Sequence, residues 1–190
     1  MLWEAVGLGL FAGWLRQGSI KQLKQINIIS WPLIILALLI QGLIWIDFNL
    51  QDSYLNSIYP LLYTFSFIIL LISIIPHRNS AGLLIIGAGI LLNLIVIAAN
   101  GGMMPVDGSA LPPDVLQELS AGKKSPFHTP MNEETLFAFL GDRITLFYRP
   151  NQLLSLGDLV IGAGAFVFIQ QNMHGNVTKV QEDHEDIKQS

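Results

Sequence analysis

The sequence contains no cysteine and few charged residues. Without cysteine, the chain has no disulfides, thiolate zinc sites, cysteine-ligated iron–sulfur clusters or cysteine nucleophiles. Charged residues make up only 13% of the 190 residues, whereas a soluble domain usually carries about 25%. The few Lys and Arg residues are scattered, so we expect no nucleic-acid partner. Because 52% of the residues are hydrophobic, the composition predicts that a bilayer is part of the solvent.

Four long apolar runs lie at residues 31–46, 58–75, 81–99 and 153–169. Each run is close to the ~17–25 residues that a helix needs to cross a ~30 Å hydrocarbon core. A fifth, shorter run at residues 2–15 is either a further span or an interfacial helix, and we favour the span. The sequence therefore predicts an all-α, polytopic transmembrane bundle of four to five helices. One domain is expected over residues 1–170, followed by a polar tail at residues 171–190.

Small residues in the first run form a stripe of their own. Ala5, Gly9 and Gly13 are spaced four apart, which places them on one face of a helix. Such a face lets another helix approach closely. Besides the lipid bilayer, another membrane protein is therefore a candidate partner through this stripe.

The charges in the short loops predict an orientation. Basic residues of these loops are Arg16, Lys21, Lys24 and Arg78. The loop at residues 47–57 contains no Lys or Arg and carries two aspartates. Since basic short loops stay in the cytoplasm, we expect the N-terminus outside, the C-terminus inside and the long connection at residues 100–152 outside.

The long connection holds most of the prolines but keeps many apolar residues, which predicts a partly ordered extracytoplasmic cap. The stretch P-P-D-V-L-Q-E-L predicts a short helix with Pro113 and Asp114 in its first turn. The stretch N-E-E-T-L-F-A-F-L predicts a second helix that is capped by Asn132.

The tripeptide L-G-D occurs twice, and its aspartates are Asp142 and Asp158. Two carboxylates close together share a proton, which provides an acid and a base that can activate water. A structural interpretation is favoured for each. Ser155 and Asp158 have the spacing of a helix capping box, and Asp142 is explained by a turn or by an ion pair with Arg143 or Arg149.

Three spaced motifs carry a resemblance to a known family. N-G-G-M-M-P-V at residues 100–106 follows an apolar run; a loop with His128, then L-G-D, then S-L-G-D follow in order. This order resembles a bacterial membrane family called domain of unknown function 5317 (DUF5317), over nearly the whole chain up to Ile169. The resemblance implies a multi-pass protein of the bacterial inner membrane and no reaction.

The paired aspartates are also weakly similar to those of lipoprotein signal peptidases. G-D-R at residues 141–143 and S-L-G-D at residues 155–158 match the order of that catalytic pair. The asparagines of both signal-peptidase motifs are missing here. The resemblance implies an intramembrane aspartate-dyad hydrolase with Asp142 and Asp158 as catalytic residues.

The interiors of the apolar runs contain two amides, Gln41 and Asn93, and no charged residue or histidine near their centres. Amides at such positions usually form hydrogen bonds to another helix. A proton pump or ion-coupled transporter needs ionisable groups within the membrane, so these functions are disfavoured.

We therefore expect a non-enzymatic binding or accessory component, with the dyad hydrolase acting at the outer membrane interface as the alternative. Candidate binding residues are Asn100, Gly101, Gly102, His128 and Arg143. The N-G-G turn either ends a helix with left-handed geometry or lines a site, and His128 is a supporting group. No cofactor and no metal site are expected.

Overall fold

The computed structural model describes residues 2–23, 28–50, 54–146 and 149–174, and these residues form a mostly helical protein. The main helices are α1 (Leu2–Leu15), α3 (Trp31–Phe48), α4 (Tyr59–Ile74), α5 (Ala81–Ala99) and α7 (Leu156–His174). A short α2 (Ile20–Leu23) follows α1. The polar tail predicted at residues 171–190 lies outside the described residues from residue 175 onward.

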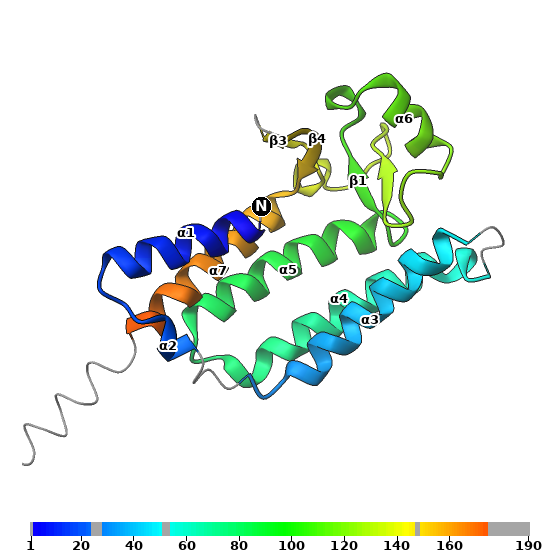
Figure 1. Ribbon diagram of the computed structural model, residues 1–190. Coiled ribbons are helices and arrows are strands. Elements are labelled where there is room, and N and C mark those ends of the chain that lie inside the picture. The colour runs from blue at the N-terminus through cyan, green and yellow to red at the C-terminus, as the bar shows by residue number, and fades with distance from the viewer. Residues whose placement is uncertain (1, 24–27, 51–53, 147–148, 175–190) are drawn as a thin grey trace, which may run out of the picture.

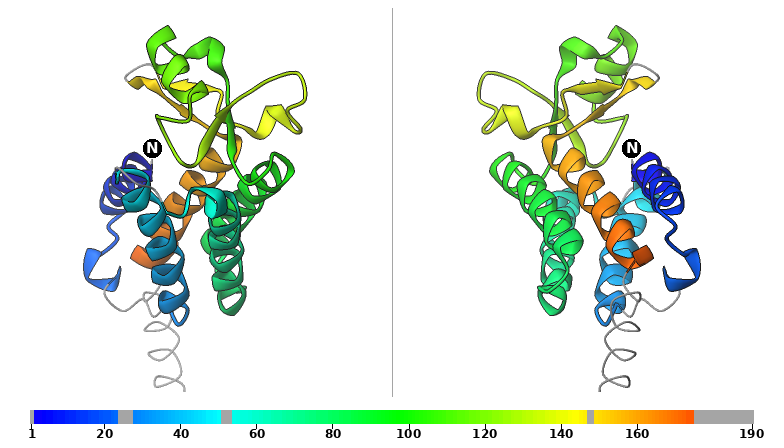
Figure 2. Two further views of the ribbon diagram at one scale, coloured as in Figure 1. Left: turned by 90° about the vertical axis from the view of Figure 1, so that its right-hand side faces the viewer. Right: turned by 90° about the vertical axis from the view of Figure 1, so that its left-hand side faces the viewer.

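The long helices pack side by side in the order α1, α7, α5, α4, α3. The residues between α5 and α7 form a separate small body at one end of these helices (Figures 1 and 2). We call this body, residues 100–155, the connection. A buried cluster joins it to the helices and contains Ile44, Tyr59, Tyr63, Val96, Ile97, Met104 and Leu140. The connection is thus anchored on α3, α4 and α5.

Three helical segments are long and apolar enough to cross a membrane: Trp31–Phe48, Asn56–His77 and Ala81–Ala99. They correspond to three of the four long apolar runs. In the fourth run, Leu153 and Leu154 belong to strand β4 (Arg149–Leu154), and α7 begins at Leu156, directly after the predicted cap Ser155. Helix α1 has 14 residues, about 21 Å at 1.5 Å per residue, which is shorter than the ~30 Å core.

Glycines bring α5 and α7 into backbone contact. A side chain on Gly82 would lie 2.5 Å from the backbone of Phe168, and one on Gly164 would lie 2.6 Å from the backbone nitrogen of Ile86. The G-A-G-A stretch of α7 at residues 162–165 therefore serves helix packing.

The small-residue stripe of α1 also packs against α7. Gly9 faces Ile169, and Gly13 faces Met173 one turn further along both helices. The two helices therefore run in the same direction from the end that carries the connection. This face of α1 is thus covered from within the chain.

The two amides in the helix interiors form the interhelical hydrogen bonds expected from the sequence. Gln41 of α3 donates to Ser66 Oγ of α4 at 2.9 Å. Asn93 of α5 donates to Asp158 of α7 at 3.0 Å. Each bond satisfies a polar group within an apolar helix interface.

The connection contains two small sheets that an all-α prediction missed. Strand β1 (Met104–Val106) pairs in parallel with β2 (His128–Pro130), and β3 (Ile144–Leu146) pairs antiparallel with β4. Three-residue strands are too short to show an alternating pattern in the sequence. The helix predicted from P-P-D-V-L-Q-E-L is present as α6 (Pro113–Ser120).

The second helix predicted for the connection, starting at Asn132, is absent. Asn132 Oδ1 instead accepts from the Glu134 N–H in a tight turn. The side chain of Asn100 binds the backbone N–H and carbonyl of Leu136 at 2.9 and 2.8 Å. These bonds hold the stretch in a turn, and only the 3-10 turn at Ala138–Leu140 follows.

Candidate functional site

The backbone around β1 positions the two groups of the candidate site. His128, the first residue of β2, lies opposite Met104 of β1. Asp142 bridges to Val106, and its backbone N–H donates to the Pro105 carbonyl at 2.9 Å. Strand β1 therefore holds His128 and Asp142 beside one another, although they are 14 positions apart in the sequence.

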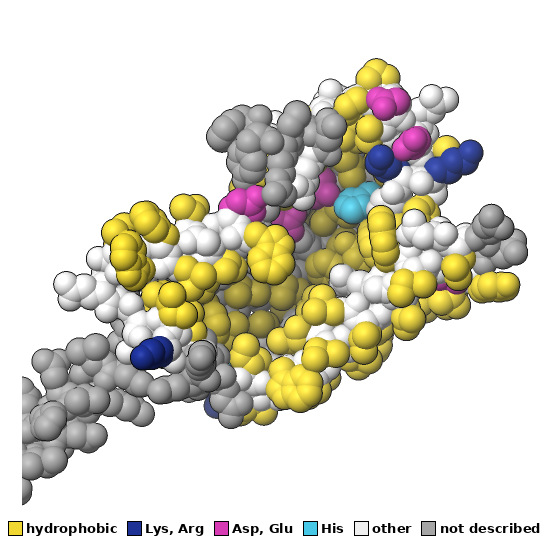
Figure 3. Space-filling model, viewed as in Figure 1, with side chains coloured by type: hydrophobic (Ala, Val, Ile, Leu, Met, Phe, Trp, Pro, Cys, Tyr) yellow, Lys and Arg dark blue, Asp and Glu magenta, His cyan; other side chains and the backbone are white. Residues whose placement is uncertain are grey.

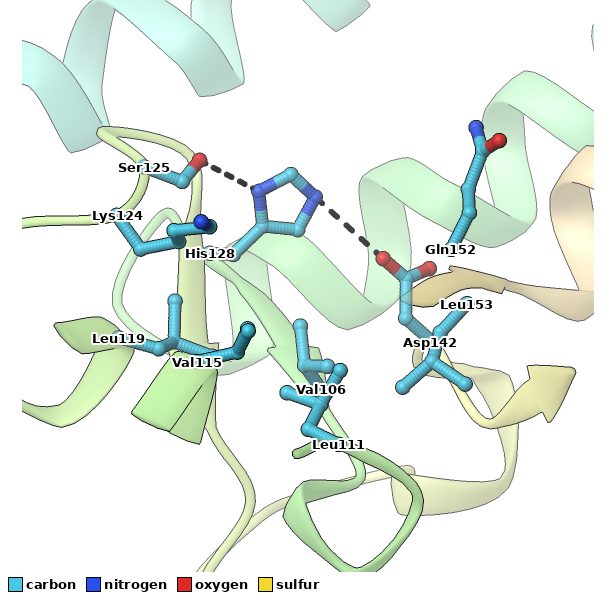
Figure 4. A pocket seen from close by; sticks show the side chains of 10 residues that line it. All are labelled: Val106, Leu111, Val115, Leu119, Lys124, Ser125, His128, Asp142, Gln152 and Leu153. Carbon is cyan, nitrogen blue, oxygen red and sulfur yellow. Dashed lines mark hydrogen bonds and ion pairs between the residues drawn. The ribbon is translucent and has the colours of Figure 1, made fainter. Parts of the chain in front are cut away.

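Three side chains form a row in this part of the connection. Ser125 Oγ lies 2.7 Å from His128 Nδ1. His128 Nε2 lies 3.4 Å from Asp142 Oδ2. Figure 4 shows the imidazole ring between the hydroxyl and the carboxylate. The site thus links a hydroxyl, an imidazole and a carboxylate in sequence.

The row borders a pocket of about 250 Å³, which we call the His128 pocket. Its apolar wall is formed by Val106, Leu111, Val115, Leu119 and Leu153. Its polar side chains are Lys124, Ser125, His128, Asp142 and Gln152 (Figure 4). Such a combination of an apolar wall with a few converging polar groups is typical of small-molecule sites.

Asp142 is the most deeply buried charged group of the pocket. The residue is 6% exposed, and its Oδ1 has no hydrogen-bond partner among the described residues. Burial raises the pKa of Asp142; the hydrogen bond and charge of His128 lower it in part, and the charge of Asp158 raises it slightly. A buried acceptor without a partner has a free-energy cost that a bound donor would remove.

The raised pKa of Asp142 predicts how stability depends on pH. The folded state binds the Asp142 proton more tightly than the unfolded state does. The resulting stabilisation is fully present below the unfolded value near 3.8 and is lost as the pH rises through the folded pKa. Melting temperatures of the detergent-solubilised protein should therefore fall with pH relative to those of Asp142→Asn over this window.

Asp107→Asn is the matched control, because hydrogen bonds from Ser109 lower the pKa of Asp107. Here the stabilisation is present above the unfolded pKa and lost as the pH falls through the folded value. The wild-type protein should therefore gain stability relative to Asp107→Asn as the pH rises. The same slope for both variants would contradict the assigned environments.

Asp158 has the capping role that the S-x-x-D spacing predicts. Its backbone N–H donates to Ser155 Oγ at 2.9 Å, and its Oδ2 accepts from the Ser155 N–H at 3.2 Å. Asn93 donates to Oδ1. Asp158 is thus bonded within the α5–α7 interface, while Asp142 faces His128, and a catalytic unit of the two aspartates stays a prediction.

The N-G-G turn lies away from the His128 pocket. Asn100 and Gly101 line a second cavity of about 320 Å³ with residues of the 129–136 stretch. The left-handed backbone occurs at Gly101 and Gly102, with φ of 70° and 83°, and not at Asn100. Gly102 packs against the Pro60 backbone, where a side chain would lie 2.6 Å from the carbonyl oxygen.

Arg143 does not pair with Asp142. Its guanidinium lies 3.8 Å from Asp107 Oδ2, on the exposed side of the connection. The expected ion pair of Asp142 with Arg143 is therefore wrong, and His128 takes that place. The other expected partner of Asp142 was Arg149, whose side chain lies outside the part of the chain that the structure describes.

Sequence reasoning missed three polar members of the pocket: Lys124, Ser125 and Gln152. The three-residue spacing of Ser125 and His128 in S-P-F-H was the available signal. Without the fold, such a spacing occurs too often to point to a site. Gln152 gave no signal, since its position depends on how β4 returns to β3.

A protein-family model matches residues 25–170, and its description is a family of unknown function (DUF5317). The match covers the three apolar helical segments, the connection and most of α7. No match was found among curated proteins or among solved structures.

Proposed function

The chain belongs to the family of unknown function DUF5317, and from its geometry we propose a membrane protein that binds a small neutral amphiphile in the His128 pocket. The observation that carries the proposal is the unpartnered, buried Oδ1 of Asp142 at the polar end of an apolar pocket. A protein with this binding function would be a binding component of the bacterial inner membrane.

The surface of the helices supports a membrane location. Large apolar side chains are exposed along α3, including Leu38, Leu39 and Leu43 at 56–59%. Figure 3 shows hydrophobic side chains over the helices, while acidic side chains and histidine gather towards the connection. Water-soluble proteins rarely leave so large an apolar surface exposed.

The distribution of basic loop residues supports an outward-facing pocket. Arg16 follows α1 and Arg78 follows α4, both at the end opposite the connection. At the end that carries the connection, Asp47 lies in the last turn of α3. Its Oδ2 accepts hydrogen bonds from the Tyr59 hydroxyl and the Leu55 N–H. By the positive-inside rule, the connection and the start of α1 lie outside, and the end of α7 lies in the cytoplasm.

The pocket chemistry favours a ligand with a hydroxyl and an ester group on an apolar chain. Asp142 Oδ1 offers an acceptor to a hydroxyl. The Lys124 ammonium donates one N–H to Glu118 Oε2 at 3.3 Å and offers another to a carbonyl oxygen. The leucine and valine wall suits an alkyl chain. At about 250 Å³, the pocket takes one short chain or only the head of a longer lipid.

A monoacylglycerol with an eight-carbon chain serves as the test ligand. It should raise the melting temperature of the protein in an ester-free detergent, because a ligand that binds the folded state stabilises it. Asp142→Asn should weaken binding about tenfold or more, since it changes the acceptor for the ligand hydroxyl. Titration calorimetry in the same detergent measures both affinities.

Asp107→Asn is the control, because it removes a carboxylate of the same connection that does not line the pocket. Its affinity should match that of the wild-type protein. Two results would show that the pocket does not bind this class of molecule. One is an equal affinity of Asp142→Asn and the wild-type protein, and the other is a titration of the wild-type protein that shows no saturable binding.

A further inference from the structure

We infer that Ser125 is a nucleophile and that the His128 pocket hydrolyses the ester of its amphiphilic ligand. The inference rests on the proposed binding function and extends it to an acyl-transfer reaction. Its basis is the row of Ser125, His128 and Asp142 along one wall of the pocket. The arrangement has the roles of a nucleophile, a base and an orienting carboxylate.

The hydrogen bonds select the imidazole tautomer that such a reaction needs. When Asp142 is ionised it is only an acceptor, so Nε2 of a neutral His128 then carries the proton. Nδ1 is then an acceptor, and Ser125 Oγ at 2.7 Å donates to it. The imidazole is thereby ready to take the proton of the hydroxyl.

The surroundings of Ser125 stabilise a negative charge on its oxygen. The backbone N–H of Phe127 donates to Ser125 Oγ at 3.2 Å. The Phe127 ring packs against Tyr63 of α4, with centroids 4.7 Å apart. This contact ties the turn at residues 125–128 to the helices, so the hydroxyl and the imidazole keep their relative positions.

The separation of 3.4 Å between His128 Nε2 and Asp142 Oδ2 is longer than in an assembled hydrogen bond. Catalytic hydrogen bonds are often long before a ligand binds and shorten in the complex. A ligand hydroxyl on Oδ1 would fix the Asp142 carboxylate and exclude water from the pocket. Asp142 is therefore a positioning residue that acts through His128.

The reaction has two balanced stages. Ser125 Oγ attacks the ester carbonyl carbon while its proton moves to His128 Nδ1. The carbon–oxygen bond to the alcohol then breaks, and the alcohol leaves with that proton. In the second stage water attacks the acyl carbon, gives a proton to Nδ1 and releases the fatty acid, and Ser125 Oγ regains its proton. Lys124, which lines the pocket and whose Nζ lies 3.3 Å from Glu118 Oε2, supplies positive charge for the carbonyl oxygen.

An octyl fluorophosphonate tests the nucleophile directly, because it forms a covalent bond with an activated serine hydroxyl. The full chain in dodecyl maltoside should gain one phosphonyl group, which peptide mapping locates on Ser125. Ser125→Ala should gain none. His128→Asn and Asp142→Asn should react at least about 100-fold more slowly, the usual size of a general-base contribution.

The pH dependence separates catalysis from a structural role of the serine. In the wild-type protein the phosphonylation rate should depend on pH, because only a neutral imidazole can take the proton of the Ser125 hydroxyl. This dependence should be lost in His128→Asn, although the turn at residues 125–128 keeps its Ser125–Phe127 bond. Ser109→Ala is the control, because Ser109 is an exposed serine of the connection whose hydroxyl donates to Asp107; it should react like the wild-type protein.

Three results would overturn the inference. One is no adduct in a wild-type protein that still binds the eight-carbon monoacylglycerol, which leaves the binding function intact. Another is an adduct on a different serine or an undiminished adduct in Ser125→Ala. The third is failure of both binding and labelling, which also overturns the proposed function.

Discussion

Replacing Gly89 with alanine is expected to lower the free energy of unfolding by about 1–3 kcal/mol, the usual cost of overpacking. A Cβ at this position would lie 2.6 Å from the Gly157 carbonyl oxygen and 2.8 Å from the Ile161 nitrogen. Both atoms belong to the α7 backbone, so no side-chain rotation can relieve the contact. Helices α5 and α7 must separate, and this interface also holds the start of α7 next to the connection.

Gly42→Ala is the matched control, because Gly42 lies in α3 and no atom lies within 4 Å of the position of its Cβ. Alanine there should leave stability unchanged or raise it by about 0.5–1 kcal/mol, the difference in helix propensity. Melting in detergent, followed by circular dichroism, compares the two variants. Equal melting temperatures would mean that α5 and α7 do not pack at this distance.

The helices could be predicted from the sequence because their signals are local. The run at residues 81–99 matches α5 in both bounds, since Ser80 and the N-G-G turn mark its ends. Asn93 and Gln41 could be assigned to interhelical bonds because an apolar surrounding leaves an amide few other partners. These arguments need only the order of residues along one helix.

The connection could be predicted only in part because its structure depends on distant residues. Asn100 reaches Leu136 across 36 positions and replaces the helix expected after Asn132. Strand β1 pairs with β2 across more than twenty residues. Neither pairing leaves a period in the sequence, so the local pattern of N-E-E-T-L-F-A-F-L indicated a helix that tertiary contacts prevent.

In the candidate site, too, the residues could be predicted from local sequence patterns, whereas their contacts could not. Asp142 could be named from the repeated L-G-D and His128 from the loop that precedes it in the motif order, but their pairing depends on β1 lying between them. Gly141 permits this, since a Cβ there would lie 2.6 Å from the Pro105 carbonyl oxygen. The sequence marked Asp142 and Asp158 as alike because both follow Leu-Gly. In the structure they face different partners.

Asp158→Asn should lower stability without changing the chemistry of the His128 pocket. The carboxylate accepts from Asn93 at 3.0 Å and from the Ser155 N–H at 3.2 Å. An amide has a single acceptor oxygen, so one of these donors loses its partner, which costs about 1–3 kcal/mol. The helix N-terminus also loses a favourable negative charge, worth about 0.3–1 kcal/mol.

Asp142→Asn provides the opposite case. It should keep or gain stability at neutral pH, because burial disfavours the ionised carboxylate, and should lose reactivity towards the phosphonate. Melting temperatures and phosphonylation rates of the folded protein, measured for both variants, separate the two roles. An aspartate dyad would activate water and form no adduct with the phosphonate, so its signature is loss of ester hydrolysis in both variants while both stay folded. Hydrolysis of the eight-carbon monoacylglycerol that is lost in a stable Asp158→Asn protein and kept in Ser125→Ala would therefore restore the dyad and remove Ser125 from the mechanism.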